Sequence, residues 1–335
     1  MTDSLTHSQR HVTVSHCHSV TQSSSQRRTI SNLMMMPLHQ VGLYVFLFLC
    51  GTSEGLNCGI DRRKALIQSV GGVSAAVSFT SAASAANSIS SRLESTLLNA
   101  PAPSYASELN GVDNLYFPSW MSGEWAATQT LTDASTPLGL KFVGGPNGSE
   151  QIATETMNEA KKQIGMPVEL KLRYISTKWG VAEDRLFNTR QRLDAFAGKS
   201  VVAAVDYANV GSSNRPSVLA MGGTEEDPLQ TTVARFKGPA AQKTFVVSHG
   251  AESLSDTKWA GYELNRSIFA LTNLNTAPPL TTDSELIWEL EKVDDNHVKA
   301  KLRIAGYLNP QSDTLYFDAR QRAVVIQDYN LDFRK

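Results

Sequence analysis

Cysteine is nearly absent from this chain of 335 residues. All three cysteines, Cys17, Cys50 and Cys58, fall within the first 58 positions. The remainder therefore has no disulfide, no thiolate nucleophile and no cysteine-ligated metal. Histidine is also scarce, with only His249 and His297 after residue 85. Neither belongs to a spacing of metal ligands, so the sequence predicts no metal site and no cofactor.

Long apolar runs are missing as well. The longest, residues 41–50, has ten positions, whereas a membrane-spanning helix needs roughly 20. A run of this length is typical of the core of a secretory signal peptide. We therefore predict a signal peptide at 34–58, behind a polar extension at 1–33 that cannot bury enough surface to fold. A buried strand or short core helix is the alternative. The mature protein is not expected to span a membrane.

A second export signal is predicted at 59–85. Arg62 and Arg63 precede an Ala- and Ser-rich stretch that ends in the small residues Ala83 and Ala85, and adjacent arginines are typical of the twin-arginine route. Two signals in series resemble the nested targeting of thylakoid lumen proteins in algae whose plastids lie inside extra membranes, where the intervening piece acts as a transit peptide. We expect the plastid thylakoid lumen as the location. The alternative is a secreted protein whose Ala-rich segment is a linker.

A surplus of positive charge is also lacking. The leader up to Ala85 holds six Lys or Arg and three Asp or Glu, which leaves 25 basic and 29 acidic side chains in the remainder. Nucleic-acid binders concentrate positive charge to displace counterions. The net charge of the remainder therefore argues against a nucleic-acid partner.

What the mature chain does have is alternation of apolar and charged residues with period two. Residues 168–174, 285–291 and 298–304 each place apolar side chains on one face and charged ones on the other. This pattern is typical of half-buried antiparallel strands. Further strands are predicted at 125–131, 200–207, 217–221, 231–237, 243–248, 262–270, 314–317 and 323–333. So many short strands predict an all-β protein, folded as an antiparallel barrel or sandwich.

Two helices are expected beside these strands. Helical spacing of Ile89, Leu93 and Leu97, ended by Pro101, predicts a short N-terminal helix and a linker over 86–114. The stretch 182–196 predicts one capping helix, whose Leu193 and neighbouring apolar residues cover an open end of the barrel.

The stretch at 116–131, "YFPSWMSGEWAATQTL", suggests which barrel this is. Gly123 and Trp125 form a Gly-x-Trp motif at the start of a strand, a pattern that resembles the lipocalin and calycin barrels. Glycine lets the entering segment pass close beneath the floor, and the indole closes that end under a basic side chain. We expect Arg320 or Arg322 to supply this cation.

A closer resemblance extends over most of residues 115–335. The segments 117–131, 184–188 ("DRLFN") and 307–333 are similar to motifs of an uncharacterised lipocalin-like domain family of cyanobacterial and plastid thylakoid lumen proteins. The resemblance implies a single barrel domain over 115–335 and carries no established reaction.

Aromatic and basic residues remain as candidates for a site. We expect one small ligand inside the barrel, contacted by inward-facing aromatic rings, with arginines near the capping helix to pair with an acidic group. These ligand-binding candidates are Trp125, Tyr174, Trp179, Trp288, Tyr307, Tyr329, Arg185 and Arg190. A packed aromatic core and solvated arginines are the alternative.

The predicted function is non-catalytic binding or transport of a small apolar molecule such as a pigment, tetrapyrrole or lipid. One alternative is an assembly or repair factor that contacts a photosynthetic membrane complex through its outer surface. The other is a barrel isomerase or epoxide-handling enzyme acting on a carotenoid-like substrate, which would need a cavity carboxylate or tyrosine with a shifted pKa. No catalytic residue is predicted.

Overall fold

The structure is a computed structural model that describes residues 88–102, 114–143, 149–208, 231–272, 279–310 and 313–335. All of them fall within the unit Met36–Lys335. The predicted leader segments 1–33, 34–58 and 59–85 lie outside the described residues, with the targeting residues Arg62, Arg63, Ala83 and Ala85. So does the strand predicted at 217–221.

A single antiparallel sheet of 11 strands dominates the described part of the chain, which confirms the all-β class. Neighbouring strands pair in the order β1-β4-β3-β2-β11-β10-β9-β8-β7-β6-β5. Their bounds are β1 Tyr116–Phe117, β2 Gly123–Ser135, β3 Pro167–Ser176, β4 Val181–Glu183, β5 Val202–Tyr207, β6 Thr232–Phe236, β7 Ala240–Ser253, β8 Lys258–Leu271, β9 Leu280–Asp294, β10 His297–Tyr307 and β11 Val325–Arg334.

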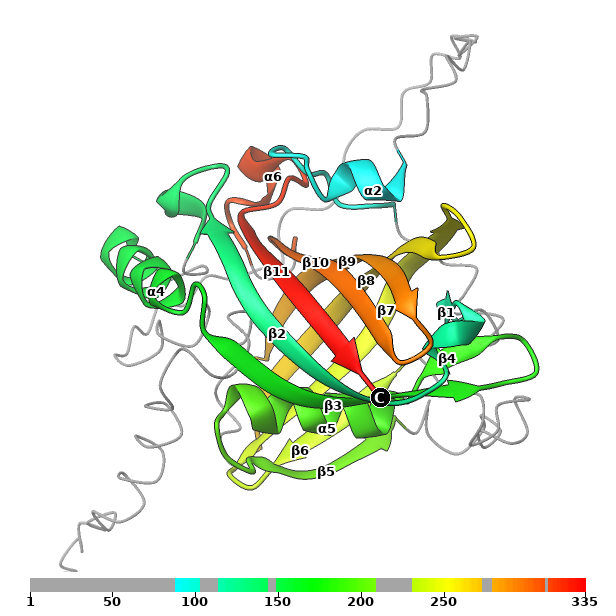
Figure 1. Cartoon of the computed structure of the whole chain (residues 1–335). Coiled ribbons are helices and arrows are strands. Elements are labelled where there is room, and N and C mark those ends of the chain that lie inside the picture. Colours follow the sequence, from blue (N-terminus) through cyan, green and yellow to red (C-terminus); the bar gives the residue numbers. More distant parts are fainter. Residues whose placement is uncertain (1–87, 103–113, 144–148, 209–230, 273–278, 311–312) are drawn as a thin grey trace, which may run out of the picture. The chain divides into compact units, whose positions relative to one another are not determined.

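The sheet curls like a barrel, but its two outer strands, β1 and β5, are not paired with each other in the described structure. Helix α5 (Arg185–Phe196) spans this gap. It contacts β3 near one end of the sheet and β5 and β6 at the other, as the ribbon in Figure 1 shows. The predicted capping helix is therefore present and completes the wall of an open, curled sheet.

The other helices are short or were not predicted. Helix α4 (Glu150–Lys162) begins where the Ser149 hydroxyl accepts a hydrogen bond from the Ile152 amide, and buries Ala153 and Met157. A strand predicted at 314–317 is wrong, because α6 (Tyr316–Ala319) lies there. The remaining elements are α2 (Ile89–Arg92), η2 (Ser119–Met121) and η3 (Leu140–Phe142). No helix in the described ranges is both long and apolar enough to cross a bilayer.

Trp125 is buried at the start of β2, where the Gly-x-Trp motif predicts the floor of the barrel. Its side chain is buried, its Nε1 donates to the Met121 carbonyl at 2.8 Å, and Phe333 meets it edge-on. Gly123 has a φ of +118°, which L side chains rarely adopt, so the entering turn requires glycine.

The cation over this indole is Lys335, whose Nζ lies 4.5 Å from the ring centroid. The expectation of Arg320 or Arg322 is wrong. Arg320 ends α6 in the left-handed region, and the Arg322 Nε donates to the Ala319 carbonyl. Both arginines precede β11, which has ten residues at about 3.3 Å each. Trp125 lies near the far end of that strand, where Arg334 pairs with Ala126, so both arginines are a whole strand length away.

The outer face of the sheet has its own apolar cluster. Residues 88–102, called here the N-terminal strap, place Leu98 and Ile89 over Leu264, Ile287 and neighbouring side chains. The strap is pinned by Arg92, whose guanidinium forms an ion pair of 2.7 Å with the buried Glu285. Part of the segment expected to be a linker therefore packs on the sheet.

Replacing the floor indole should destabilise the protein far more than replacing an exposed one. We expect Trp125→Ala to lower the free energy of unfolding by about 3–5 kcal/mol, because a large buried side chain leaves a cavity. Trp179→Ala is the matched control, since Trp179 is 40% exposed, and should cost about 1 kcal/mol or less. Urea unfolding measures both values, and equal losses would contradict the assignment of Trp125 to the floor.

Candidate functional site

A cavity of about 230 Å³ lies inside the curl of the sheet, between helix α5 and strands β6 to β10. We call it the inner cavity. One side of its lining is apolar and comes from the helix and from inward-facing positions of β9 and β10. These side chains are Leu193, Phe196, Leu286, Trp288 and Ile304.

The other side of the inner cavity is a bank of uncharged polar side chains on β6 to β9. They are Thr232, Gln242, Thr244, Asn265, Ser267 and Ser284. Several are joined to one another: the Gln242 Nε2 donates to the Thr244 and Ser267 hydroxyls at 3.2 and 3.3 Å. The bank forms because β8 points polar residues inward, while its alternating apolar residues, such as Leu264, lie under the N-terminal strap.

A buried ion pair crosses the cavity. Arg185, at the start of α5, donates from Nη1 and Nη2 to the two carboxylate oxygens of Glu263 on β8, at 3.0 and 2.6 Å. Asn114 accepts a further hydrogen bond from Arg185, and Asn265 donates one to Glu263. These additional hydrogen bonds offset part of the desolvation free energy that each buried charge of the bidentate pair costs.

These contacts fix the charges of the pair. Burial alone would raise the pKa of Glu263, but the charge and hydrogen bonds of Arg185, aided by Asn265, outweigh it and hold that pKa below its ordinary value. Burial would likewise lower the pKa of Arg185, and Glu263 raises it instead. Both groups are therefore ionised across the neutral range.

A second pair stands beside the first. Arg192 of α5 forms an ion pair with Glu183 at the end of β4, and Asn188 donates to the same carboxylate at 3.0 Å. Burial acts to lower the pKa of Arg192, yet the Glu183 charge raises it. Two positive and two negative side chains thus line the inner cavity, and their charges cancel.

Three polar atoms at this cavity have no hydrogen-bond partner among the described residues. They are the Arg185 Nε, the Gln242 Oε1 and the Asn265 Oδ1, and all three are shielded from solvent. Each belongs to a side chain that lines the inner cavity. An unsatisfied buried polar group costs about 1–3 kcal/mol in folding free energy, so their gathering in one place makes the inner cavity a candidate binding site.

Two of the predicted candidates line the inner cavity, namely Trp288 and Arg185. Tyr174 and Tyr329 also belong to the buried core cluster around Trp125, without lining the cavity. Burial raises the pKa of both phenols, and for Tyr174 the nearby Glu183 raises it further.

Three other candidates do not face the interior. Tyr307 lies in the outer apolar cluster and donates from its hydroxyl to Glu285 at 2.6 Å. Trp179 sits in the turn between β3 and β4 and is 40% exposed, with Lys178 over its ring. Arg190 is exposed on α5 and donates to the Ala203 carbonyl. These positions correct the expectation that the three contact a ligand in the barrel.

Sequence reasoning missed most of the polar lining. Glu263, Asn265 and Ser267 occupy alternate positions of one strand, and this period of two was the available signal. Polar residues at alternate positions of a strand normally face water, so the pattern alone does not indicate that they face the interior.

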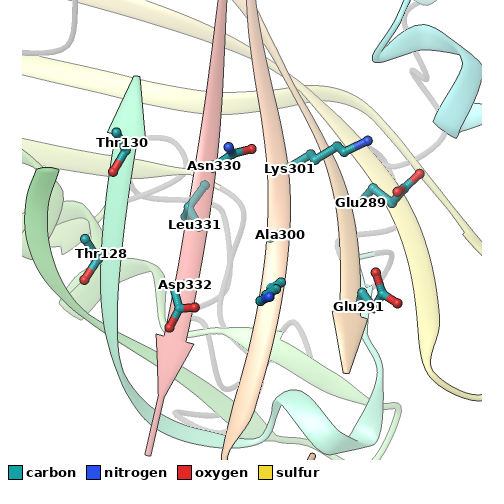
Figure 2. Close-up of a pocket in the computed structure, with 10 residues that line it drawn as sticks. Thr128, Thr130, Glu289, Glu291, Ala300, Lys301, Asn330, Leu331 and Asp332 are labelled. Atoms are coloured by element: carbon teal, nitrogen blue, oxygen red, sulfur yellow. The ribbon is translucent and has the colours of Figure 1, made fainter. Parts of the chain in front are cut away.

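The outer face carries a second depression, of about 430 Å³, which we call the outer groove. Figure 2 shows its side chains rising from four neighbouring strands, β2, β11, β10 and β9. Charges of both signs line it: Glu289, Glu291, Lys299, Lys301 and Asp332, beside Thr128, Thr130 and Asn330. Unlike the inner cavity, it has no aromatic side chain among its lining residues.

Ligands for a metal ion do not assemble in the described ranges, where no three His, Cys, Asp or Glu side chains come together. His297 forms a pair with Asp332, from Nε2 to Oδ2 at 2.9 Å.

Comparison with known proteins places the domain. Residues 110–335 match a family described as a domain of unknown function, DUF6816. The chain belongs to this family. No curated protein and no solved structure matches it. The DUF6816 domain therefore spans the whole sheet together with α4, α5 and α6.

Breaking the buried pair should destabilise the DUF6816 domain in a pH-dependent way. Glu263→Gln leaves Arg185 without its counter-ion, so we expect a loss of about 3–5 kcal/mol at pH 7. Because the folded-state pKa of Glu263 is lowered, its contribution is present above the unfolded-state pKa of about 4.3 and is lost as pH falls through the folded value. The difference from wild type should therefore narrow in acid.

Glu124→Gln is the control for this experiment. The Arg173–Glu124 pair is exposed, with side chains 40% and 49% accessible, and should contribute about 0–1 kcal/mol. Urea unfolding at pH 7 and pH 3 compares the two variants. A constant difference for Glu263→Gln at both pH values would contradict the predicted linkage.

Proposed function

We propose that the DUF6816 domain binds one small amphipathic molecule in the inner cavity and performs no covalent chemistry on it. The observation that carries this proposal is a cavity with an apolar side, made by Trp288, Leu286 and Ile304, opposite a bank of polar side chains. Ligand sites in proteins combine an apolar lining with a few placed polar groups in the same way.

The charge states of the cavity favour binding over acid–base catalysis. A general acid or base works best when its pKa lies near the operating pH. The pKa shifts of Glu263, Arg185 and Arg192 all run away from neutrality, so these groups stay charged. This supports a carrier rather than the alternative isomerase or epoxide-handling enzyme.

The size of the cavity favours a compact ligand. Its volume of about 230 Å³ is somewhat below the range of about 300–1,000 Å³ that is common for pockets of drug-sized molecules. A single ring system, or the head of a lipid or pigment, suits it better than a whole tetrapyrrole.

The proposed setting is the plastid thylakoid lumen, with secretion as the alternative. Its support is the order of two export signals at 34–58 and 59–85. Mass spectrometry of small molecules that remain bound to protein from its natural source, together with the N-terminal sequence of that protein, tests ligand and location at once. A mature start far from residue 86 would contradict the location, and recovery of no organic molecule would contradict the carrier.

Filling the inner cavity should weaken the binding of a neutral probe. N-phenyl-1-naphthylamine is a suitable probe because its fluorescence rises in an apolar site. We expect Ser284→Leu, which adds bulk at a lining position of β9, to raise the dissociation constant at least about tenfold, with a stability cost of about 1–3 kcal/mol.

Thr130→Leu provides the matched control, because Thr130 lines the outer groove. It should leave the dissociation constant of the probe unchanged. If Thr130→Leu weakens binding and Ser284→Leu does not, the outer groove is the ligand site and the proposal is wrong.

A further inference from the structure

We infer that the ligand of the inner cavity is a neutral molecule whose polar end carries hydroxyl groups. This rests on the proposed function and specifies the class of ligand. The inference begins with the three atoms that lack a partner among the described residues, two acceptors on Gln242 and Asn265 and one donor on Arg185.

The orientation of the Asn265 amide is fixed by its neighbour. Its Nδ2 donates to the Glu263 Oε1 at 3.0 Å, and an ionised carboxylate only accepts hydrogen bonds. The nitrogen must therefore face Glu263, which leaves the Oδ1 as an acceptor. A ligand in the inner cavity that contacts this atom must donate a hydrogen bond to it.

The Arg185 Nε requires the opposite partner. Both Nη atoms of this guanidinium are engaged by Glu263 and Asn114, whereas the Nε is a buried donor with no acceptor in the described part of the chain. A hydroxyl group both donates and accepts. It is the simplest group that serves an amide oxygen and a guanidinium nitrogen in one cavity.

Charged ligands fit the cavity less well. A carboxylate would accept from the Arg185 Nε, but it cannot donate to the amide oxygens of Asn265 and Gln242. An ammonium group would donate to both oxygens and repel the two arginines. Arg185 and Arg192 are each already matched by a glutamate, so no net charge remains to offset the desolvation of an ion.

The apolar side of the cavity defines the rest of the ligand. Trp288, Leu286 and Ile304 offer an indole beside two aliphatic side chains, a surface that suits a ring or a short hydrocarbon body. The inferred class is therefore a compact apolar skeleton with one or two hydroxyl groups.

Four naphthalene probes of equal ring size test this inference by displacement of N-phenyl-1-naphthylamine. They are naphthalene, 2,3-dihydroxynaphthalene, 2,3-dimethoxynaphthalene and 2-naphthoate. We expect the diol to bind at least about tenfold more tightly than the other three, because only its hydroxyls supply donors to the amide oxygens. The dimethoxy compound has polar oxygens that cannot donate hydrogen bonds, so it separates the effect of donation from that of polarity. The naphthoate tests whether the arginines bind an anion.

Asn265→Leu should reduce the advantage of the diol to about threefold or less, while the dissociation constant of naphthalene stays unchanged. Gln242→Met serves as the second variant, since Gln242 is only half-buried, and it keeps the test valid if Asn265→Leu does not fold. Thr130→Leu in the outer groove should alter neither constant.

The outcomes separate the two levels of the argument. Equal binding of diol, ether and naphthalene would overturn the hydroxyl inference and leave the cavity as an apolar site whose polar atoms are served by water. Tightest binding of the naphthoate would overturn it in favour of an anion. Failure of every probe to bind would overturn the proposed function itself.

Discussion

The bidentate salt bridge between Arg185 and Glu263 is the contact on which the inner cavity depends. The sheet does not close by hydrogen bonds between its outer strands, so helix α5 has to complete the wall. Arg185 stands at the first turn of that helix and reaches across the interior to β8. Because both charges are buried, movement of the helix away from β8 would leave each of them unpaired in the protein interior, which is strongly destabilising. The pair therefore holds the wall at a fixed distance from the polar bank.

The polar bank exists because both faces of this part of the sheet are covered. On β8, Leu264 and Tyr262 pack beneath the N-terminal strap, while Glu263 and Asn265 point into the interior. The apolar surface that a strand normally directs inward is buried on the outside instead. Because these apolar side chains are buried on the outer face, the inward positions of β8 can carry the charged and amide side chains that line the inner cavity.

The sequence pattern predicted the class of fold and the floor better than the site. Alternation placed the inward faces of β3, β9 and β10, and the Gly-x-Trp motif placed Trp125. Tyr307 shares its parity along β10 with Lys299 and Arg303, so the period of two places it on the outer face, although its aromatic ring made it a candidate for the interior. Glu263 was missed because its partner, Arg185, is 78 positions away, and no local spacing reveals such a pair. Helix α4 was not predicted. Its sequence signals are the N-cap Ser149 and the four-residue spacing of the buried Ala153 and Met157, but its exposed residues are strongly polar and weaken the apolar pattern.

The position of β11 has a consequence for how the domain forms. This strand lies between β10, which immediately precedes it among the strands, and β2, so that Thr132 and Asp328, 196 positions apart, share a hydrogen bond of 3.0 Å. The chain loses the entropy of closing this long loop before the stabilising contacts form, and this slows folding. Until β11 arrives, β2 and β10 present open edges that can pair with other chains. A chaperone that covers these two edges would therefore protect a newly made chain from aggregation until β11 has paired with both strands.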